Sequence, residues 1–600
     1  MALEEKLRDD IKDEYKWDLS KIYSSKEDWQ KDFDVVKEEI LKIKDYKDNF
    51  LKDGKKFYEF LKYDENVSRR LEKIYYYAHL NYDADTLNEK YKVMMNKVSD
   101  LYVIYNELSS FVTPELLKLD KKKLESFYGD EEKLKEYKFN IENIYRYKEH
   151  TLDEDKERML SNLSNCLSSP EEIYEVLTDS DFEYDYIIDE NGNKVKFNES
   201  NYSLFIKSKD RNIRKKAFEM LHDKYKKYIR TIATIYKSEV ETNVVTAKIK
   251  NYDSAISASL YSDNVPVKIY DNLIKVVNDN LNVLYNYYDL KKKILSLDEF
   301  HMYDTYVEII NKVDKKYTFD EAKEMVISAL SVLGDEYISN LKKAFDEKWI
   351  DIYHNKGKRS GAYSSGNYDI NPYVLLNYEG TLDDVSTLAH ELGHSMHTYL
   401  SCHNNPYQYS SYEIFVAEVA STVNELLLAN YMLKNSKDKN EKLAIINHIL
   451  DLYKATLFRQ TMFAEFEQKT HSLREQGEVL TSDLLSNIYY DLIKKYFGKN
   501  VVCDDLIKYE WARIPHFYYG FYVYKYATGI SAASYIVDGI LNNKEGQLES
   551  YINFLKTGGS MYPLDELKVA NIDLTNEEVI QSAIKTFEKY IKEFIEIYNS

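Results

Sequence analysis

Apolar and aromatic side chains recur every three or four positions along most of the chain. Residues 17–180 show this spacing, as at Leu71 and Ile74, with Lys, Glu and Asp between the apolar positions. Such spacing gathers the apolar side chains on one helical face and leaves the charged ones on a solvated face. The same pattern returns in residues 210–345 and from residue 381 onward, so the sequence predicts a mainly helical protein.

Two short stretches interrupt the helical pattern. In residues 184–197, two β-favouring runs flank Asn191-Gly192, which predicts a hairpin. Residues 357–380 hold four of the 17 glycines, which favours strands and tight turns. We place an organisational boundary near 180–205. We expect two helical lobes with small β-sheet elements.

Composition narrows the possible functions. The 600 residues include only 7 Pro and 17 Gly, too few for a sandwich or barrel of many strands. A net charge of −20 argues against nucleic acid as a partner. With a mean hydropathy of −0.56 and no apolar run of about 18 residues, we expect no membrane span. The charged N-terminus and three widely spaced cysteines predict a cytoplasmic protein with reduced thiols.

The candidate chemistry centres on His390-Glu391-Leu392-Gly393-His394. Thr381 and the acids that follow it resemble the start of a helix. On such a helix, His390 and His394 project from one face, one turn apart, and can share one zinc ion. Glu391 is placed to contact a water on the metal. Four of the twelve histidines fall in residues 390–403, which strengthens this interpretation.

A catalytic zinc site needs a third protein ligand. The metzincin pattern fails because residue 400 is Leu. The following helical stretch offers Glu418 among apolar and small residues, where an unpaired carboxylate would be costly to bury. We therefore prefer Glu418 to Glu425 as the ligand. We expect Glu425 and His397 to act as hydrogen-bond partners around the metal.

Tyrosine is concentrated in one short stretch of the chain: residues 517–526 hold five of the 58 tyrosines. If this stretch is helical, Tyr519, Tyr522 and Tyr526 lie on one face, with His516 beside them. Their phenol and imidazole groups could donate hydrogen bonds to an oxyanion. An aromatic core stripe is the alternative interpretation.

Taken together, these motifs resemble the oligoendopeptidase F group of the thimet-oligopeptidase-like zinc metallopeptidases. The resemblance rests on the segments GKRSGAYSSGNYDINPYVLLNY (357–378), HELGHSMH (390–397), FVAEVASTVNE (415–425), IPHFYYGFYVYKYATG (514–529) and GGSMYPLDELK (558–568). It implies a helical fold of two lobes enclosing a deep substrate channel. It also implies an N-terminal helical lobe over 1–200, a zinc metallopeptidase region over 201–585 and a helix end over 586–600.

The resemblance also assigns roles to individual residues. It makes His390, His394 and Glu418 the zinc ligands, Glu391 the general base and His516 a group near the scissile carbonyl. It places Phe521 where the family has a tyrosine, and a shift of one residue recovers Tyr522 and Tyr526 as catalytic candidates. Gly361, Ala362 and Tyr363 resemble a strand that binds substrate, and we group Tyr519 with them as substrate-binding.

The sequence therefore predicts an endopeptidase that cleaves short peptides, with one zinc ion as cofactor. Two alternatives remain: a zinc carboxypeptidase or peptidyl-dipeptidase on a similar helical scaffold, and a peptide-binding protein without catalysis.

Overall fold

The computed structural model describes residues 5–310 and 315–600 and divides into two compact units. Unit 1 comprises Met1–Glu149, Lys315–Tyr431 and Ile536–Asn571, and unit 2 comprises His150–Asp314, Met432–Tyr535 and Ile572–Ser600. Each unit is therefore built from three separate stretches of sequence. The predicted division at residue 200 stays a prediction, and the first four residues, used to predict the location, lie outside the described ranges.

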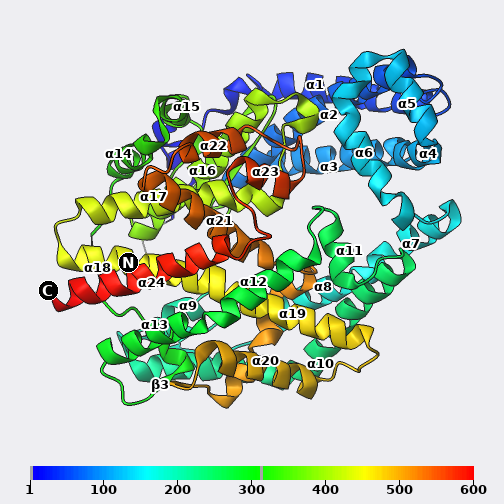
Figure 1. Ribbon diagram of the computed structural model, residues 1–600. Coiled ribbons are helices and arrows are strands. Elements are labelled where there is room, and N and C mark those ends of the chain that lie inside the picture. The colour runs from blue at the N-terminus through cyan, green and yellow to red at the C-terminus, as the bar shows by residue number, and fades with distance from the viewer. Residues whose placement is uncertain (1–4, 311–314) are drawn as a thin grey trace. The chain divides into compact units, whose positions relative to one another are not determined.

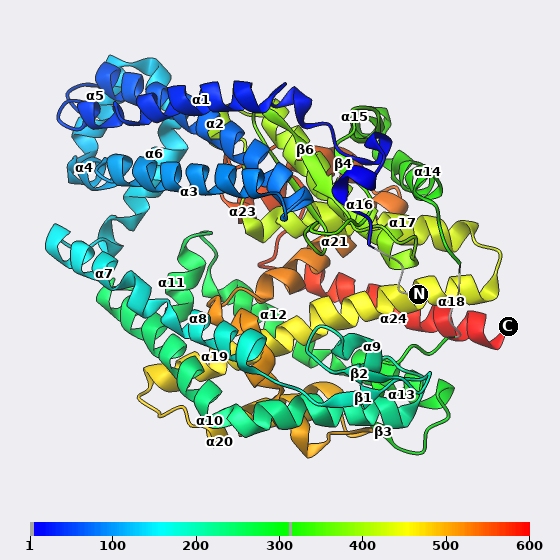
Figure 2. The ribbon, with the colours of Figure 1, turned by 180° about the vertical axis from the view of Figure 1, so that it is seen from behind.

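The first part of unit 1 consists of helices that pack on one another, with α2 between α1 and α3 (Figures 1 and 2). These helices are α1 (Lys26–Ile40), α2 (Gly54–Ala84), α3 (Glu89–Ser109), α4 (Val112–Lys118), α5 (Lys121–Asp130) and α6 (Lys138–Arg146). Along α2, Leu71 and Ile74 are buried, which confirms the apolar face that the sequence predicts.

A small sheet and a second group of helices complete unit 1. The helices are α14 (Phe319–Leu330), α15 (Asp335–Asp346), α16 (Leu382–Asn404), most of α17 (Ile414–Asn435), α22 (Gln547–Leu555) and α23 (Pro563–Val569). The strands are β4 (Ile350–Asp351), β5 (Tyr363–Asn367) and β6 (Ile370–Leu375), in the order β4-β6-β5. β4 pairs in parallel with β6, and β5 pairs antiparallel to β6, so β5 is an edge strand. The strands expected within residues 357–380 are confirmed.

Unit 2 is also mainly helical. Its helices are α7 (Glu154–Leu167), α8 (Ser169–Glu175), α9 (Tyr202–Ile206), α10 (Arg211–Ile249), α11 (Ala255–Tyr261), α12 (Val267–Asp279), α13 (Leu281–Ile294), α18 (Lys439–Tyr453), α19 (Gln460–Glu475), α20 (Ser482–Phe497), most of α21 (Tyr524–Leu541) and α24 (Glu578–Asn599). Asp210 caps α10 through a hydrogen bond from the backbone N–H of Asn212. In α24, Ile580, Ile584 and Phe587 follow helical spacing and are buried, and α24 lies beside α18 (Figure 1).

Two strand pairs belong to unit 2. β1 (Tyr186–Ile188) and β2 (Lys194–Lys196) pair antiparallel around a turn at Gly192, which has a φ of +80°. This confirms the predicted hairpin. β3 (Phe300–His301) and β7 (Val501–Val502) form a short parallel pair. None of the helices in the described ranges combines the length and the apolar character that crossing a membrane requires.

Candidate metal centre

The helix that carries the histidine motif begins where its sequence predicts. Thr381 caps α16: its Oγ1 accepts a hydrogen bond from the backbone N–H of Asp384, and the Asp384 carboxylate accepts one from the backbone N–H of Thr381. This reciprocal pair satisfies two N–H groups that have no partner within the helix. The helix then continues to Asn404, so His390 and His394 lie one turn apart on a single rigid element.

α17 lies very close to α16, and Gly393 makes this approach possible. A Cβ atom on Gly393 would lie 2.6 Å from both the carbonyl oxygen of Ala420 and the Cα of Ser421. The side chain of Asn424 joins the two helices by donating a hydrogen bond of 3.1 Å to the carbonyl oxygen of Ala389. The third predicted ligand, Glu418, is thereby held on α17 opposite the two histidines.

The three predicted ligands form a compact triangle. The Nε2 atoms of His390 and His394 are 3.2 Å apart, and they lie 3.5 and 3.6 Å from Oε2 of Glu418. A zinc ion with tetrahedral ligands at 2.0–2.2 Å needs its ligand atoms about 3.3–3.6 Å apart. The three residues therefore fit one zinc ion, and they form a group that could hold a metal among the described residues.

Glu391 lies next to this triangle and is buried, with 6% of its surface exposed. Burial raises the pKa of its carboxyl group to about 7, and the charges of Glu418 and Glu425 add to the shift, whereas His390 opposes it. A carboxyl group with a pKa near neutrality can both accept and return a proton at physiological pH.

Neighbouring side chains orient the ligands. Glu425 accepts a hydrogen bond from Nδ1 of His390, which leaves Nε2 free to face the other ligand atoms. Burial lowers the pKa of His390, but this bond and the charge of Glu425 outweigh burial and raise the pKa. For His394, burial and then the charge of His390 lower the pKa. Ser421, which the sequence analysis missed, donates a hydrogen bond of 3.0 Å to Oε2 of Glu418.

His397 differs from the expectation. Its ring is fully buried, and neither ring nitrogen has a hydrogen-bond partner in the described part of the chain. It stacks instead on Tyr412, with ring centroids 3.6 Å apart. Burial lowers its pKa to about 3, so the ring is neutral. The structure gives His397 a packing contact in place of the expected hydrogen bond, because its ring, two turns beyond His390 along α16, packs against Tyr412 and Phe554.

The predicted substrate strand lies next to α16. Gly361, with a φ of +82°, and Ala362 lead into β5, which begins at Tyr363. The hydroxyl groups of Ser364 on β5 and Ser395 on α16 are 2.8 Å apart, which fixes the strand against the metal-binding helix. As an edge strand, β5 has a side on which a peptide can pair.

The tyrosine-rich stretch belongs to unit 2, and the assumption that it is helical is wrong. A 3₁₀ turn covers Pro515–Tyr518, and α21 begins only at Tyr524. Between them, Gly520 and Phe521 adopt left-handed φ values of +44° and +57°. A buried carboxylate from another helix, Glu467, accepts the backbone N–H of Phe521 at 2.9 Å and holds this turn.

The turn nevertheless gathers the predicted aromatic residues. The ring of His516 lies 6.0 Å from Tyr519, 6.3 Å from Tyr522 and 6.1 Å from Tyr526, centroid to centroid. Burial lowers the pKa of His516. Phe521 is buried, with 1% exposed, and packs on His471, so its ring belongs to the core. Tyr519 is exposed, whereas Tyr522 and Tyr526 are partly buried.

Comparisons with known proteins identify the family of the chain. The family model for peptidase family M3 matches residues 204–586, and the oligopeptidase F model matches residues 115–184. The chain is 42% identical to oligopeptidase PepF of Bacillus subtilis, with 98% of this chain and 88% of that protein aligned. It is 38% identical to group B oligopeptidase PepB of Streptococcus agalactiae, with 98% and 97% aligned.

Solved structures of peptidases resemble this chain in both fold and sequence. A putative peptidase from Chlamydophila abortus superposes with a TM-score of 0.91 at 37% identity, over 99% of this chain and all of that one. Oligoendopeptidase F from Enterococcus faecium superposes with a TM-score of 0.75 at 33% identity, over 96% and 99% of the two chains.

Proposed function

Because the chain belongs to peptidase family M3, we propose that it is a zinc-dependent endopeptidase that hydrolyses internal bonds of short oligopeptides. The observation that carries this proposal is the triangle of His390, His394 and Glu418, with ligand atoms 3.2 to 3.6 Å apart and Glu391 beside it. The names of the relatives, oligopeptidase and oligoendopeptidase F, support peptides as substrates.

When bound by these three residues, zinc supplies a Lewis acid that activates water and polarises the scissile carbonyl group. Glu391 accepts a proton from the attacking water and delivers it to the leaving amine. The position of this carboxyl group suits both steps, because it is buried next to the three ligands.

We assign substrate positioning and oxyanion stabilisation to the other predicted residues. Gly361, Ala362 and Tyr363 lie at or before an edge strand that suits pairing with an extended peptide backbone. His516, together with Tyr522 or Tyr526, donates hydrogen bonds to the oxyanion, and Tyr519 contacts the substrate. This last assignment rests on the resemblance and on the clustering of the four rings in unit 2.

The decisive experiment replaces the proposed base. Glu391→Gln is expected to keep its zinc and to lose about 10²–10⁴-fold in turnover, because glutamine cannot accept the proton. Glu379→Gln, which alters an exposed acid shortly before the same helix, is the matched control and should retain activity. Zinc content is measured on the same samples. Unchanged cleavage by Glu391→Gln would refute the assignment.

Peptides with blocked ends separate the alternatives. Internal cleavage of a peptide with an amidated C-terminus supports an endopeptidase, whereas a strict need for a free C-terminus indicates a carboxypeptidase or peptidyl-dipeptidase. Cleavage that a chelator abolishes and zinc restores excludes a peptide-binding protein without catalysis. The cytoplasmic location stays a prediction.

A further inference from the structure

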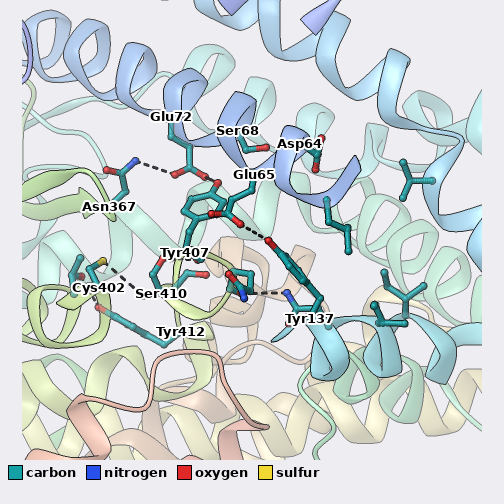
Figure 3. A pocket seen from close by; sticks show the side chains of 18 of the residues that line it. Asp64, Glu65, Ser68, Glu72, Tyr137, Asn367, Cys402, Tyr407, Ser410 and Tyr412 are labelled. Carbon is teal, nitrogen blue, oxygen red and sulfur yellow. Dashed lines mark hydrogen bonds between the residues drawn. The ribbon is translucent and has the colours of Figure 1, made fainter. Parts of the chain in front are cut away.

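A cavity of about 600 Å³ lies within unit 1, between α2, α6, the end of β5 and the second half of α16. This volume is within the usual range for ligand pockets. Figure 3 shows Glu65 and Glu72 extending from α2 toward the hollow, with Cys402 and Tyr412 on its opposite wall. The apolar part of the lining is formed by Phe57, Leu61, Leu116, Ile141 and Ile144.

The cavity lies close to the metal centre along α16. Thr398 and Cys402, which line it, follow His394 by four and eight residues. At 1.5 Å per residue, they lie about 6 and 12 Å beyond His394 along the helix. An extended peptide advances about 3.3 Å per residue, so this span corresponds to about two to four residues. Gly366 on β5, the strand proposed to pair with substrate, also lines the cavity.

Two carboxylates in the cavity wall lack a positive partner. Asp64 accepts a hydrogen bond from the hydroxyl group of Tyr105 at 2.9 Å, and Glu72 accepts bonds from Tyr407 at 2.7 Å and Asn367 at 3.0 Å. All three donors are neutral, and neither carboxylate forms an ion pair in the part of the chain that the structure describes. Burial raises the pKa of both groups, which reflects the cost of holding a charge there.

The nearby cations are already engaged. Lys62 pairs with Glu65 at 2.7 Å, and Arg69 forms a bidentate pair with Asp369, with bonds of 2.7 and 2.9 Å. The cavity thus combines an apolar wall with two partly buried acids whose charge is not balanced. A group with an apolar stem and a positive end would satisfy both parts.

We propose that this cavity is a specificity pocket for a lysine or arginine side chain of the peptide substrate, two to four residues from the cleaved bond. The proposal rests on the proposed peptidase function. The methylene stem lies against the apolar wall, and the ammonium or guanidinium group pairs with one of the two carboxylates, Asp64 or Glu72, which lie about 12 Å apart along α2.

The test uses matched peptides of one sequence in which each position in turn carries lysine or norleucine. Norleucine keeps the apolar stem and lacks the charge. For wild-type protein, we expect lysine at one position, two to four residues from the cleaved bond, to raise kcat/KM at least about tenfold over norleucine. In the double variant Asp64→Asn/Glu72→Gln, the ratio of kcat/KM for the lysine peptide to kcat/KM for the norleucine peptide should fall to about one. The single variants Asp64→Asn and Glu72→Gln serve if the double variant does not fold; one of them should lower the ratio, and an unchanged ratio in both would overturn the proposal.

Glu59→Gln, an exposed acid on the same helix that pairs with Lys56, is the control and should keep the ratio. Cleavage of the norleucine peptides with no preference for lysine at any position would overturn the pocket proposal and leave the peptidase function intact. Failure to cleave either peptide would instead count against the function itself. A preference that depends on a free N-terminus, tested with acetylated peptides, would overturn the assignment to a side chain.

Discussion

We predict that Gly393→Ala disrupts the metal centre although residue 393 is not a ligand. The new Cβ would lie 2.6 Å from backbone atoms of Ala420 and Ser421 on α17. Ordinary contact begins at 3.4 Å, so the two helices must separate by about 0.8 Å, the difference between these distances. Because the opposing atoms are helix backbone, no side chain can rotate away to relieve the contact.

The displacement acts directly on the ligand triangle. Glu418 moves with α17, so its distances to His390 and His394, now 3.5 and 3.6 Å, lengthen by up to the same amount. Tetrahedral zinc needs about 3.3–3.6 Å between ligand atoms. We therefore expect zinc affinity to fall by about 10–100-fold. A shift of about 1 Å can also lower turnover by about 100-fold, and overpacking costs about 1–3 kcal/mol of stability.

The assay is a competition titration of zinc against a chromophoric chelator, with kcat/KM and the melting temperature measured on the same samples. Gly129→Ala is the control, because a Cβ there meets nothing within 4 Å and the residue lies in helix α5. It should leave zinc binding unchanged. If Gly393→Ala binds zinc within twofold of wild type and retains full kcat/KM, the close approach of α16 and α17 does not determine the metal geometry.

Two further predictions concern carboxyl groups, one partly and one fully buried. Glu425→Ala removes the acceptor for Nδ1 of His390 and should weaken zinc binding by about 10–100-fold, with a smaller loss in Glu425→Gln. If a zinc titration gives Glu425→Ala the same affinity as wild type, Glu425 does not orient His390. Glu566 is fully buried, its carboxyl oxygens have no hydrogen-bond partner among the described residues, and burial raises its pKa from 4.5 to about 9. Between pH 4.5 and about 9, the Glu566 carboxyl group is ionised in the unfolded chain and protonated in the folded one. The free energy of unfolding therefore falls by up to about 1.4 kcal/mol per pH unit as pH rises. The melting temperature of Glu566→Gln should therefore exceed that of wild type increasingly from pH 5 to 8, and parallel curves would refute this account.

Local rules of sequence predict the metal-binding helix well. The cap at Thr381, the start of α16 and the alignment of His390 with His394 all depend on residues within four positions of one another. The hairpin around Gly192 follows from the same kind of information. In each case the interactions that decide the conformation are formed by neighbours in the chain.

The tyrosine-rich stretch shows where local rules fail. Helical spacing in residues 516–526 suggested one face of a helix, but the chain instead turns at Gly520 and Phe521. The acceptor of the hydrogen bond that holds this turn is Glu467, 54 residues earlier in the sequence. The buried ring of Phe521 also packs on His471. Long-range contacts of this kind override helical preference, and the sequence of the stretch alone does not contain them.

The acids of α2 show the same limit for a candidate site. Their helical spacing among Lys and Glu is typical of a solvated face, and the sequence predicts such a face for the charges of residues 17–180. Glu72 instead contacts Tyr407 and Asn367, about 300 residues away. The surroundings make the difference: an acid facing water keeps its ordinary pKa, whereas burial raises the pKa of Glu72 although the hydrogen bonds from Tyr407 and Asn367 oppose this shift. A charge pattern therefore becomes evidence for a binding pocket only when the fold shows which groups surround each charge and which of them could balance it.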